Sequence, residues 1–400
     1  MRINFLLLAF LLAGCDGNGV GSYPTTPPPP VQDDTAFVQA AVDVGGVVTF
    51  AAKTYHLSRT ILIKTSATSI VGVGPETVFD YQPSAQTQHC ATDRVFTTPC
   101  TFEDAPPRRI AAPIAVGDKA FSAFAAADVA DLKYGDWLLI NDVDSVFGDK
   151  VAIDWVQVAG VSGVTVNLVQ PFRMAFTTAR PWDPGKSGLG FTPIPLIENI
   201  QMRNFKVVVE RTPTTPTAGI SLFGVMNADI DRVTVENHNG QPFYSFLSKG
   251  VTVTNSQAIG GRVLSEFASS VDLTLSDNHF TGDGPGFGLD LGLGFFSVTN
   301  NWIDQSDNIG FYVLYGVHDG TISGNHVAYV NYVPAGGNAA GLVIRGSQNI
   351  AVSDNSFAGG SGPRSVGISV GGAVGEIPLP SINIGVSGNT INGFVTPVQE

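Results

Sequence analysis

The chain has 400 residues, of which 44% are hydrophobic and 14% are charged, and its formal net charge is -13. Nucleic acid is therefore excluded as an expected partner, because phosphate binding requires clustered lysine and arginine. A strongly anionic polymer is disfavoured as a substrate for the same reason. The 46 glycines and 25 prolines supply the turns of a long core made of short strands.

The first residues predict export. Met1-Arg2 precedes an apolar run from Ile3 to Leu12, which is too short to span a bilayer and has the size of a signal-peptide core. The run ends in Leu-Ala-Gly before Cys15, which resembles the lipobox of bacterial lipoproteins. The resemblance implies removal of residues 1–14 and lipidation of Cys15. An ordinary secretory peptide is the alternative.

Residues 15–31 predict a tether, because they are rich in glycine, proline, serine and threonine and include Pro27 to Pro30. A lipid anchor would thus be the only membrane contact, at the periplasmic face or the cell surface. In an exported chain, Cys90 and Cys100 favour a loop-closing disulfide. Two buried thiols are the alternative.

Residues 32–105 predict a capping helix and the first strands of a solenoid. The segment Asp33 to Asp43 has the pattern of a short amphipathic helix, with Asp34 suited to its N-cap. Short apolar runs follow as far as Ile63. A helix at this position can cover the open end of a stack of strands, which would otherwise invite aggregation.

Four features of this segment resemble the pectate-lyase-like right-handed parallel β-helix superfamily: Asp-Asp-Thr before the helix, Gln39-Ala40-Ala41, Gly45-Gly46 and Tyr55. That superfamily includes polygalacturonases, rhamnogalacturonases, epimerase-like pectate lyases and phage tailspikes. Ala51-Ala52-Lys53 stands where many relatives have proline and glycine. The resemblance implies a right-handed β-helix with a polysaccharide groove. The Asp-Asp pair and the Gly-His-Gly of polygalacturonases are absent, so their catalytic set is not transferred.

Residues 106–195 predict an inserted β-module. Runs of period two, such as Trp137 to Ile140 and Val164 to Leu168, are joined by glycine and aspartate turns. The module is expected either to bind substrate or a partner, or to brace the solenoid laterally.

Residues 196–400 predict the parallel β-helix repeats. An aliphatic residue, two small or polar residues and an asparagine recur, with the asparagines 23, 24, 30 and 34 residues apart. The pattern appears at Leu275–Asn278, Val298–Asn301, Ile322–Asn325, Val352–Asn355 and Val386–Asn389. Asparagine tolerates left-handed dihedrals, and its amide can bond the amide of the next coil, so these residues are interpreted as structural. The predicted fold class is therefore all-β.

Alternation predicts a polar cluster on the outer face. If Leu289 and Leu291 point inward, Asp290 points outward, and stacking places Tyr312 about 4.8 Å along the axis. The candidate catalytic residues are Asp290, Glu266, Arg345 and Tyr312. A carboxylate, a phenol and a guanidinium can carry acid/base chemistry on a sugar. A solvated face with scattered polar residues is the alternative.

Variable loops follow each asparagine turn, and loops of this kind carry functional residues. The candidate substrate-binding residues are Asp283, Tyr329, Tyr332 and His318. No resident cofactor is expected; Asp304 and Asp307 are weak calcium candidates that would need adjacent loops to bring them together with Asp283.

The predicted function is that of an exported, lipid-anchored protein that cleaves or modifies a polysaccharide, as a lyase or a glycoside hydrolase. A non-catalytic carbohydrate-binding or surface-structural protein is the competing class. The polysaccharide is the expected partner, and the repeat pattern leaves a homotrimer open.

Overall fold

The computed structural model describes residues 32–83, 93–100, 106–143, 150–178, 188–209, 216–261, 264–282, 286–304, 306, 309–330, 339–359, 365–371 and 380–399. The predicted signal peptide and tether lie outside these residues, as do Cys15, Cys90, Asp283, Asp307, Tyr332 and the side chain of Tyr329. Within the described ranges no helix is long and apolar enough to cross a membrane.

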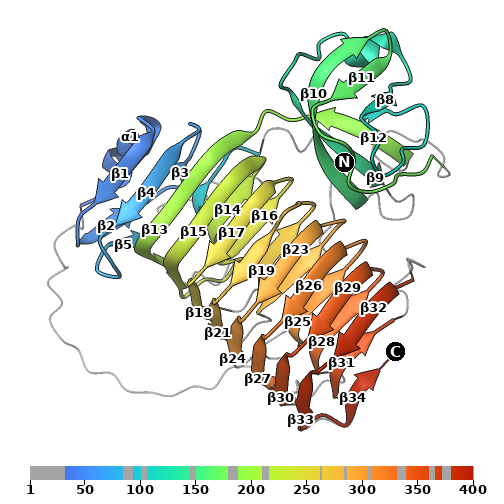
Figure 1. Ribbon diagram of the computed structural model, residues 1–400. Coiled ribbons are helices and arrows are strands. Elements are labelled where there is room, and N and C mark those ends of the chain that lie inside the picture. The colour runs from blue at the N-terminus through green and yellow to red at the C-terminus, as the bar shows by residue number, and fades with distance from the viewer. Residues whose placement is uncertain are drawn as a thin grey trace, which may run out of the picture. The chain divides into compact units, whose positions relative to one another are not determined.

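Most of the described chain winds into a right-handed parallel β-helix, as predicted (Figure 1). Each coil of the repeat region contributes one strand to a ten-stranded sheet, which we call sheet B. It contributes two further strands to an eighteen-stranded sheet, sheet A, which folds into two arms. Strands of successive coils pair in parallel throughout both sheets.

Sheet B consists of β3 (Ile61–Leu62), β6 (Asp93–Thr97), β14 (Thr217–Phe223), β16 (Phe243–Phe246), β19 (Ser265–Ala268), β22 (Phe287–Asp290), β25 (Ile309–Leu314), β28 (Ala340–Arg345), β31 (Val366–Val370) and β34 (Thr396–Gln399). The first arm of sheet A consists of β1 (Gly46–Phe50), β4 (Thr68–Gly72), β17 (Lys249–Thr254), β20 (Thr274–Ser276), β23 (Gly294–Thr299), β26 (His318–Ser323), β29 (Gln348–Ser353) and β32 (Ile382–Ser387). The second arm consists of β2 (Thr54–Leu57), β5 (Val78–Tyr81), β18 (Gln257–Gly261), β21 (His279–Gly282), β24 (Trp302–Asp304), β27 (His326–Val330), β30 (Ser356–Gly359) and β33 (Thr390–Asn392). Two long strands, β13 (Ile197–Val209) and β15 (Val225–Glu236), run through both arms.

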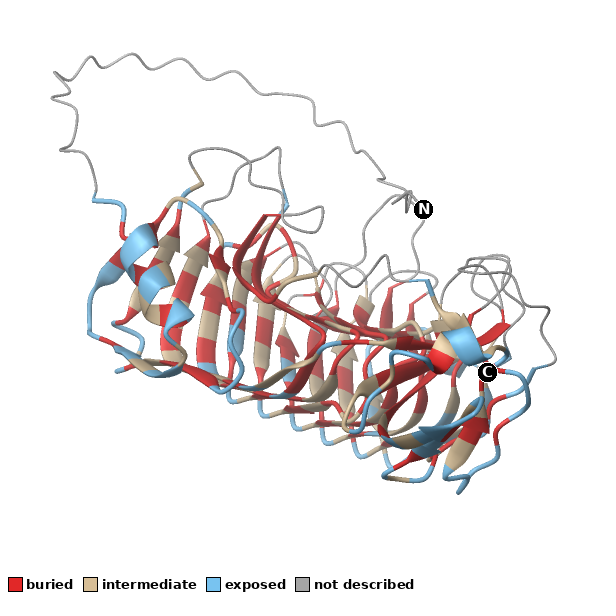
Figure 2. Cartoon of the chain, turned by 90° about the horizontal axis from the view of Figure 1, so that it is seen from above, coloured by how far each residue is buried: buried red, intermediate tan, exposed pale blue. Residues whose placement is uncertain are grey.

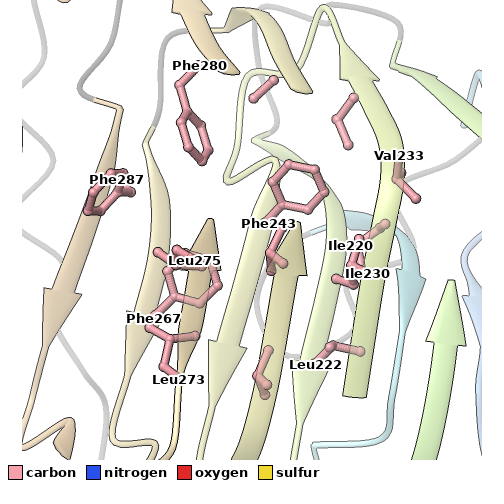
Figure 3. Packing of buried hydrophobic residues seen from close by; sticks show 14 of the residues in the cluster. Ile220, Leu222, Ile230, Val233, Phe243, Phe267, Leu273, Leu275, Phe280 and Phe287 are labelled. Atoms are coloured by element: carbon pink, nitrogen blue, oxygen red, sulfur yellow. The ribbon is translucent and has the colours of Figure 1, made fainter. Parts of the chain in front are cut away.

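The core fills the space between the sheets, because alternation turns every second side chain inward. Leu275, Phe280 and Phe287 come from three successive strands of one coil and are all at most 3% exposed (Figure 3). Buried residues alternate with more exposed ones along many strands (Figure 2). A stack built in this way buries its apolar side chains only against neighbouring coils, so each coil depends on the next.

The five repeat asparagines form a ladder between the two arms of sheet A, and all of them except Asn389 are buried. The side-chain amide of Asn301 donates to Oδ1 of Asn325 (2.9 Å), and Asn325 donates in the same way to Asn355. The predicted amide contacts between coils are therefore present. The expected left-handed dihedral lies one residue earlier, as at Asn300 (φ 55°) and Asp354 (φ 58°). The left-handed residue makes the bend, and the asparagine after it turns inward to bond the next coil.

The helix α1 (Thr35–Asp43) packs against β2 and β3 at the N-terminal end of the stack. Asp34 makes no capping bond with its side chain, contrary to the prediction; it accepts from the backbone N–H of His56 (3.1 Å). Asp33 instead accepts from the N–H of Thr35 (2.9 Å). Hydrogen bonds from Ser58 and Thr35 lower the pKa of Asp33 to about 2. Asp33 therefore fixes the start of the helix.

Residues 108–193 carry a six-stranded antiparallel sheet, sheet C. Its order is β7 (Arg108–Arg109), β12 (Gly188–Pro193), β9 (Trp137–Val143), β10 (Lys150–Ser162), β11 (Thr165–Leu168) and β8 (Ala120–Ser122). A short 3-10 helix, η1 (Ala126–Val129), follows β8. Sheet C has its own apolar core, around residues such as Phe121 and Phe191, and a second small cluster joins Trp155 to Leu247 of the β-helix.

An ionic network also joins sheet C to the β-helix. Arg173 pairs with Asp154, which is 1% exposed (2.7 Å), and with Asp272, the residue that also binds Lys249. The Arg173 guanidinium lies 3.9 Å from the ring centroid of Phe295. A paired, partly buried charge fixes one geometry, because separating the partners would leave a buried ion unpaired.

Candidate active site on the outer face of sheet B

The register of sheet B brings Glu266 and Tyr312 to the two sides of one glycine. Glu266 of β19 pairs with Gly288 of β22, and Gly288 pairs with Tyr312 of β25. A Cβ added to Gly288 would lie 2.4 Å from the Tyr312 ring. The phenol therefore leans over the glycine, into the space that a side chain on β22 would fill.

Asp290 does not stand beside Tyr312, and the predicted register is wrong by two residues. Asp290 pairs with Ala268, in the outward row next to that of Glu266 and Tyr312. The prediction aligned Gly288 with Gly310, but the strand begins with Phe287, which pairs with Phe311. Gly286 and Gly288 are two residues apart, so the sequence allowed either glycine to be aligned with Gly310.

Leu291 is not inward either. It has a left-handed φ of 54° and forms the turn that ends β22, whereas Leu289 is fully buried as predicted. The backbone N–H of Leu291 donates to Oδ1 of Asp290 (2.7 Å). The turn thus holds the Asp290 carboxylate at the edge of sheet B.

Glu266 lies in a desolvated position. Burial raises the pKa of its carboxyl, and a hydrogen bond from Nε2 of Gln241 to Oε2 (3.0 Å) opposes that shift only in part. A carboxyl kept protonated above its ordinary range can donate a proton at a working pH. Glu266 therefore has the environment of a general acid.

Tyr312 lies within the electrostatic field of both acids. Burial raises the pKa of its phenol, and the negative charges of Glu266 and Asp290 raise it further. The phenol consequently stays protonated and can donate a hydrogen bond. Glu266 and Asp290 are one strand apart and two residues offset along the sheet, which corresponds to about 8 Å between their Cα atoms. The two carboxyls and the phenol form one group.

Aromatic residues flank the two acids on the N-terminal side. Tyr244 pairs with Glu266 in the register, and its ring centroid lies 5.3 Å from that of Phe223 and 6.3 Å from that of Phe246. Tyr244 and Phe246 were not among the predicted site residues, although the alternation from Phe243 to Phe246 indicates that both point outward. An aromatic surface beside carboxylates suits a sugar, which has both C–H faces and hydroxyl groups.

Strand β10 of sheet C forms a wall beside Asp290. A Cβ on Gly316 would lie 2.0 Å from the carbonyl oxygen of Val151, and one on Gly292 would lie 3.0 Å from the N–H nitrogen of Ala152. The ammonium of Lys150 lies 5.5 Å from the ring centroid of Phe246. The turns after β22 and β25 therefore need glycine, because the backbone of β10 occupies the space of a side chain.

Arg345 lies on the same face but two coils from Asp290. It pairs with Leu314, in the outward row that continues from Asp290. Its Nη2 donates to Oγ of Ser369 (2.7 Å) and its Nη1 to the Ser369 carbonyl (3.1 Å). Burial lowers the pKa of the guanidinium. These hydrogen bonds orient the Arg345 side chain toward β31 of the next coil.

Other predicted binding and metal residues lie elsewhere. His318 has no exposed surface; it bonds Asp319 (2.9 Å), and its ring packs edge-on against Phe295. A side chain buried in this way does not fit the predicted substrate-binding role of His318. Asp304 bonds Nε2 of His279 (3.1 Å). Cys100 is disulfide-bonded. Across the described ranges, no group of three or more His, Cys, Asp or Glu side chains is arranged to hold a metal ion.

The raised pKa of Glu266 predicts a pH effect on stability. The folded state keeps this proton at pH values where the unfolded chain, with an ordinary pKa of 4.5, has lost it. The free energy of unfolding should therefore fall as the pH rises from about 4.5 through the raised value. Glu266→Gln should remove this part of the fall, so the difference in Tm between variant and wild type should grow with pH. A constant difference between pH 4 and 8 would contradict the burial of this carboxyl.

Comparisons with known proteins agree on the fold. The model of the family described as periplasmic copper-binding protein (NosD) matches residues 198–391, less than half of the chain. PfbA, a surface adhesin of Streptococcus pneumoniae, has a TM-score of 0.56 at 13% identity, over 90% of this chain and 77% of that one. The chain is a parallel β-helix. No curated protein sequence matches it.

Two further solved structures have lower TM-scores. The mannuronan C-5 epimerase AlgE6 A-module of Azotobacter vinelandii has a TM-score of 0.47 at 12% identity, over 92% of each chain. The tailspike gp49 of Pseudomonas phage LKA1 has a TM-score of 0.48 at 15% identity, over 85% of this chain. This chain spans 57% of the length of that tailspike.

Proposed function

We propose that this protein is an exported glycoside hydrolase that binds a polysaccharide along the outer face of sheet B. The observation that carries the proposal is the pair of acids Glu266 and Asp290 in different environments. Burial raises the pKa of Glu266, whereas Asp290 accepts a backbone hydrogen bond at the edge of sheet B. Glycoside hydrolysis uses one protonated and one ionised carboxyl beside the scissile bond.

In this mechanism Glu266 is the general acid. It gives its proton to the glycosidic oxygen, and the C–O bond to the leaving sugar breaks. Asp290 acts from the neighbouring strand, either by activating a water molecule or by attacking the anomeric carbon directly. The separation of the two carboxyl groups in the sugar complex decides between these routes, since inverting enzymes hold them roughly 6.5–9.5 Å apart and retaining enzymes about 5–5.5 Å. Tyr312 donates a hydrogen bond to the substrate.

The geometry favours hydrolysis over elimination. A lyase would require Arg345 or Tyr312 as its base, but the raised pKa of Tyr312 makes the phenolate hard to form. Burial lowers the pKa of the Arg345 guanidinium, but its Nη atoms donate to Ser369 on the next coil, on the side away from the two acids. A lyase also acts beside a uronate carboxylate, which the carboxylate of Asp290 would repel. The substrate class supported here is an uncharged polysaccharide, in agreement with the net charge of -13.

The second candidate is a carbohydrate-binding surface protein without catalysis. The partly exposed rings of Tyr244 and Phe246 beside the acids support it, because aromatic rings bind sugars without any reaction. PfbA, with the same fold, is a surface adhesin. In this case Glu266 and Asp290 would only donate or accept hydrogen bonds.

Product analysis on a panel of polysaccharides separates these candidates. Hydrolysis releases new reducing ends without ultraviolet absorbance, and elimination releases ends that absorb. We expect reducing ends alone, from a neutral polymer. Ultraviolet-absorbing ends would overturn the choice of hydrolysis, and binding without cleavage of any polymer would favour the second candidate.

We also propose that a lipid on Cys15 anchors the protein to the cell envelope, with residues 15–31 as the tether. Cys15→Ser should move the protein from the membrane fraction to the soluble fraction, because the acyl chains supply the binding free energy. Cys100→Ser is the matched control and should leave the protein in the membrane fraction. If Cys15→Ser stays in the membrane fraction, another segment holds the protein there.

A further inference from the structure

The second arm of sheet A carries an exposed tryptophan on its outer face. Trp302 is 46% exposed, while its neighbour Ile303 is buried in the core. Trp302 pairs in the register with His279 on one side and with His326 on the other. It is the most exposed aromatic side chain in the described coils of the repeat region. The packing of the β-helix does not account for this exposure.

The two flanking histidines make different contacts with their surroundings. The His326 ring lies against it, with 3.8 Å between ring centroids. His279 instead bonds Oδ2 of Asp304 through Nε2 (3.1 Å), and its side chain is 43% exposed. One face of the indole is therefore covered, and the half-exposed remainder lies beside a paired imidazole and carboxylate.

A small pocket of about 10 Å³, with room for one water molecule, adjoins this group at Asp304 but does not reach Trp302 or His279. Its lining includes Asp304, Thr281, Gly282 and Pro242. Thr281 and Asp304 pair in the register, and Asp304 shares the outward face of β24 with Trp302 because it lies two residues further along. An aromatic surface, a hydroxyl, an imidazole and a carboxylate thus lie on adjacent strands. A pyranose ring uses such groups, since its C–H face packs on an aromatic ring and its hydroxyls bond polar groups at the edge.

We propose that Trp302, His279 and Asp304 form a second carbohydrate-binding site, on the outer face of the second arm and separate from sheet B. Its ligand is a neutral pyranose unit of a polysaccharide. The Asp304 carboxylate disfavours a uronate at this position. A second copy of the chain is a poorer occupant, because the outward row through His279, Trp302 and His326 continues with polar residues: Gln257 on one side, and Ser356 and Thr390 on the other. The inference goes beyond the proposed function, since it holds whether or not sheet B is catalytic.

Affinity electrophoresis tests the site in gels that contain glucomannan, xylan or mixed-linkage β-glucan, with alginate as the polyuronate. All proteins carry Glu266→Gln, so that the polymer is not consumed. We expect retardation in at least one neutral gel, and little in alginate. Trp302→Ala should weaken the apparent Kd at least about tenfold, and Asp304→Asn or His279→Gln should weaken it less. Tyr134→Ala, which removes an exposed aromatic of the module, is the control and should change nothing.

Three results would contradict the proposal of a second carbohydrate-binding site. The first is retardation of the Glu266→Gln parent protein by no neutral polymer, and the second is equal retardation of the Trp302→Ala and Tyr134→Ala proteins. The third is an oligomer that Trp302→Ala dissociates in analytical ultracentrifugation, which would make this face a contact between copies. The Glu266→Gln background keeps the test apart from catalysis, because loss of cleavage does not affect it.

Discussion

Glu266→Gln should lower kcat on the cleaved polysaccharide by roughly 10²- to 10⁴-fold, the usual contribution of a general acid. Glutamine keeps the size of the side chain and can still bond Gln241, but it has no proton to give to the leaving oxygen. The protein should remain folded, with an unchanged circular dichroism spectrum. Asp290→Asn should cause a loss in the same range, because the reaction requires both carboxyls.

The matched control is Glu236→Gln. Glu236 lies on sheet A and pairs with Lys206 (3.1 Å), away from the outer face of sheet B. The same chemical change there should leave kcat within about twofold of the wild type, since surface ion pairs contribute little. If the folded Glu266→Gln and Asp290→Asn proteins both keep full activity, the catalytic site lies elsewhere.

Asn325→Ala should lower the free energy of unfolding by at least about 4 kcal/mol. Asn325 is 1% exposed and accepts from the N–H and the amide of Asn301, both at 2.9 Å. It donates to Oδ1 of Asn355 and to the carbonyl of Val298. Alanine would remove all four hydrogen bonds, each worth about 0.5–1.5 kcal/mol, and would leave the buried N–H of Asn301 without an acceptor, which costs about 1–3 kcal/mol more. Chemical denaturation monitored by circular dichroism measures the loss.

Asn349→Gly is the control for the ladder. Asn349 is exposed, has a left-handed φ of 55°, and bonds Asp319 (3.0 Å) and Asn383 (2.9 Å) where water can replace both contacts. Glycine adopts the same dihedral, so the loss should stay below about 1 kcal/mol. Equal losses in the two variants would show that burial of the ladder does not contribute to stability.

The sequence predicted the β-helix because its repeat has a physical cause. Every coil needs an inward polar group that bonds its neighbours at the bend, and asparagine supplies both a donor and an acceptor, as Asn325 does. The dihedral was assigned to the wrong residue, because either position of the pair Asn300-Asn301 suits a left-handed turn. A bend and the bond that secures it can lie on adjacent residues.

The predicted candidate residues do include a group that lies close together, but the predicted alignment of their strands is wrong. Glu266, Asp290 and Tyr312 do lie near one another, yet Tyr312 stands opposite Gly288. Alternation fixes only whether a side chain points in or out, so a shift of two residues keeps the pattern and changes the neighbours. The pairing of residues between neighbouring strands decides which acid lies beside the phenol of Tyr312.

The contribution of the inserted module could not be predicted from the sequence. The backbone of Val151 packs against Gly316, although the two residues are far apart in the chain. In the sequence, a backbone contact of this kind is visible only as a glycine, and a glycine can equally indicate an ordinary turn. The wall that β10 forms beside Asp290 therefore became visible only with the structure.

The location of a bound sugar tests the central claim most directly. A crystal structure of the Glu266→Gln protein with an oligosaccharide of the cleaved polymer should place the glycosidic oxygen within hydrogen-bond distance of residue 266, with Asp290 on the other side of the anomeric carbon. Sugar rings should extend over Tyr244 and Phe246. An oligosaccharide bound only on the 106–195 module, or only at Trp302, would contradict the assignment of the active site to sheet B.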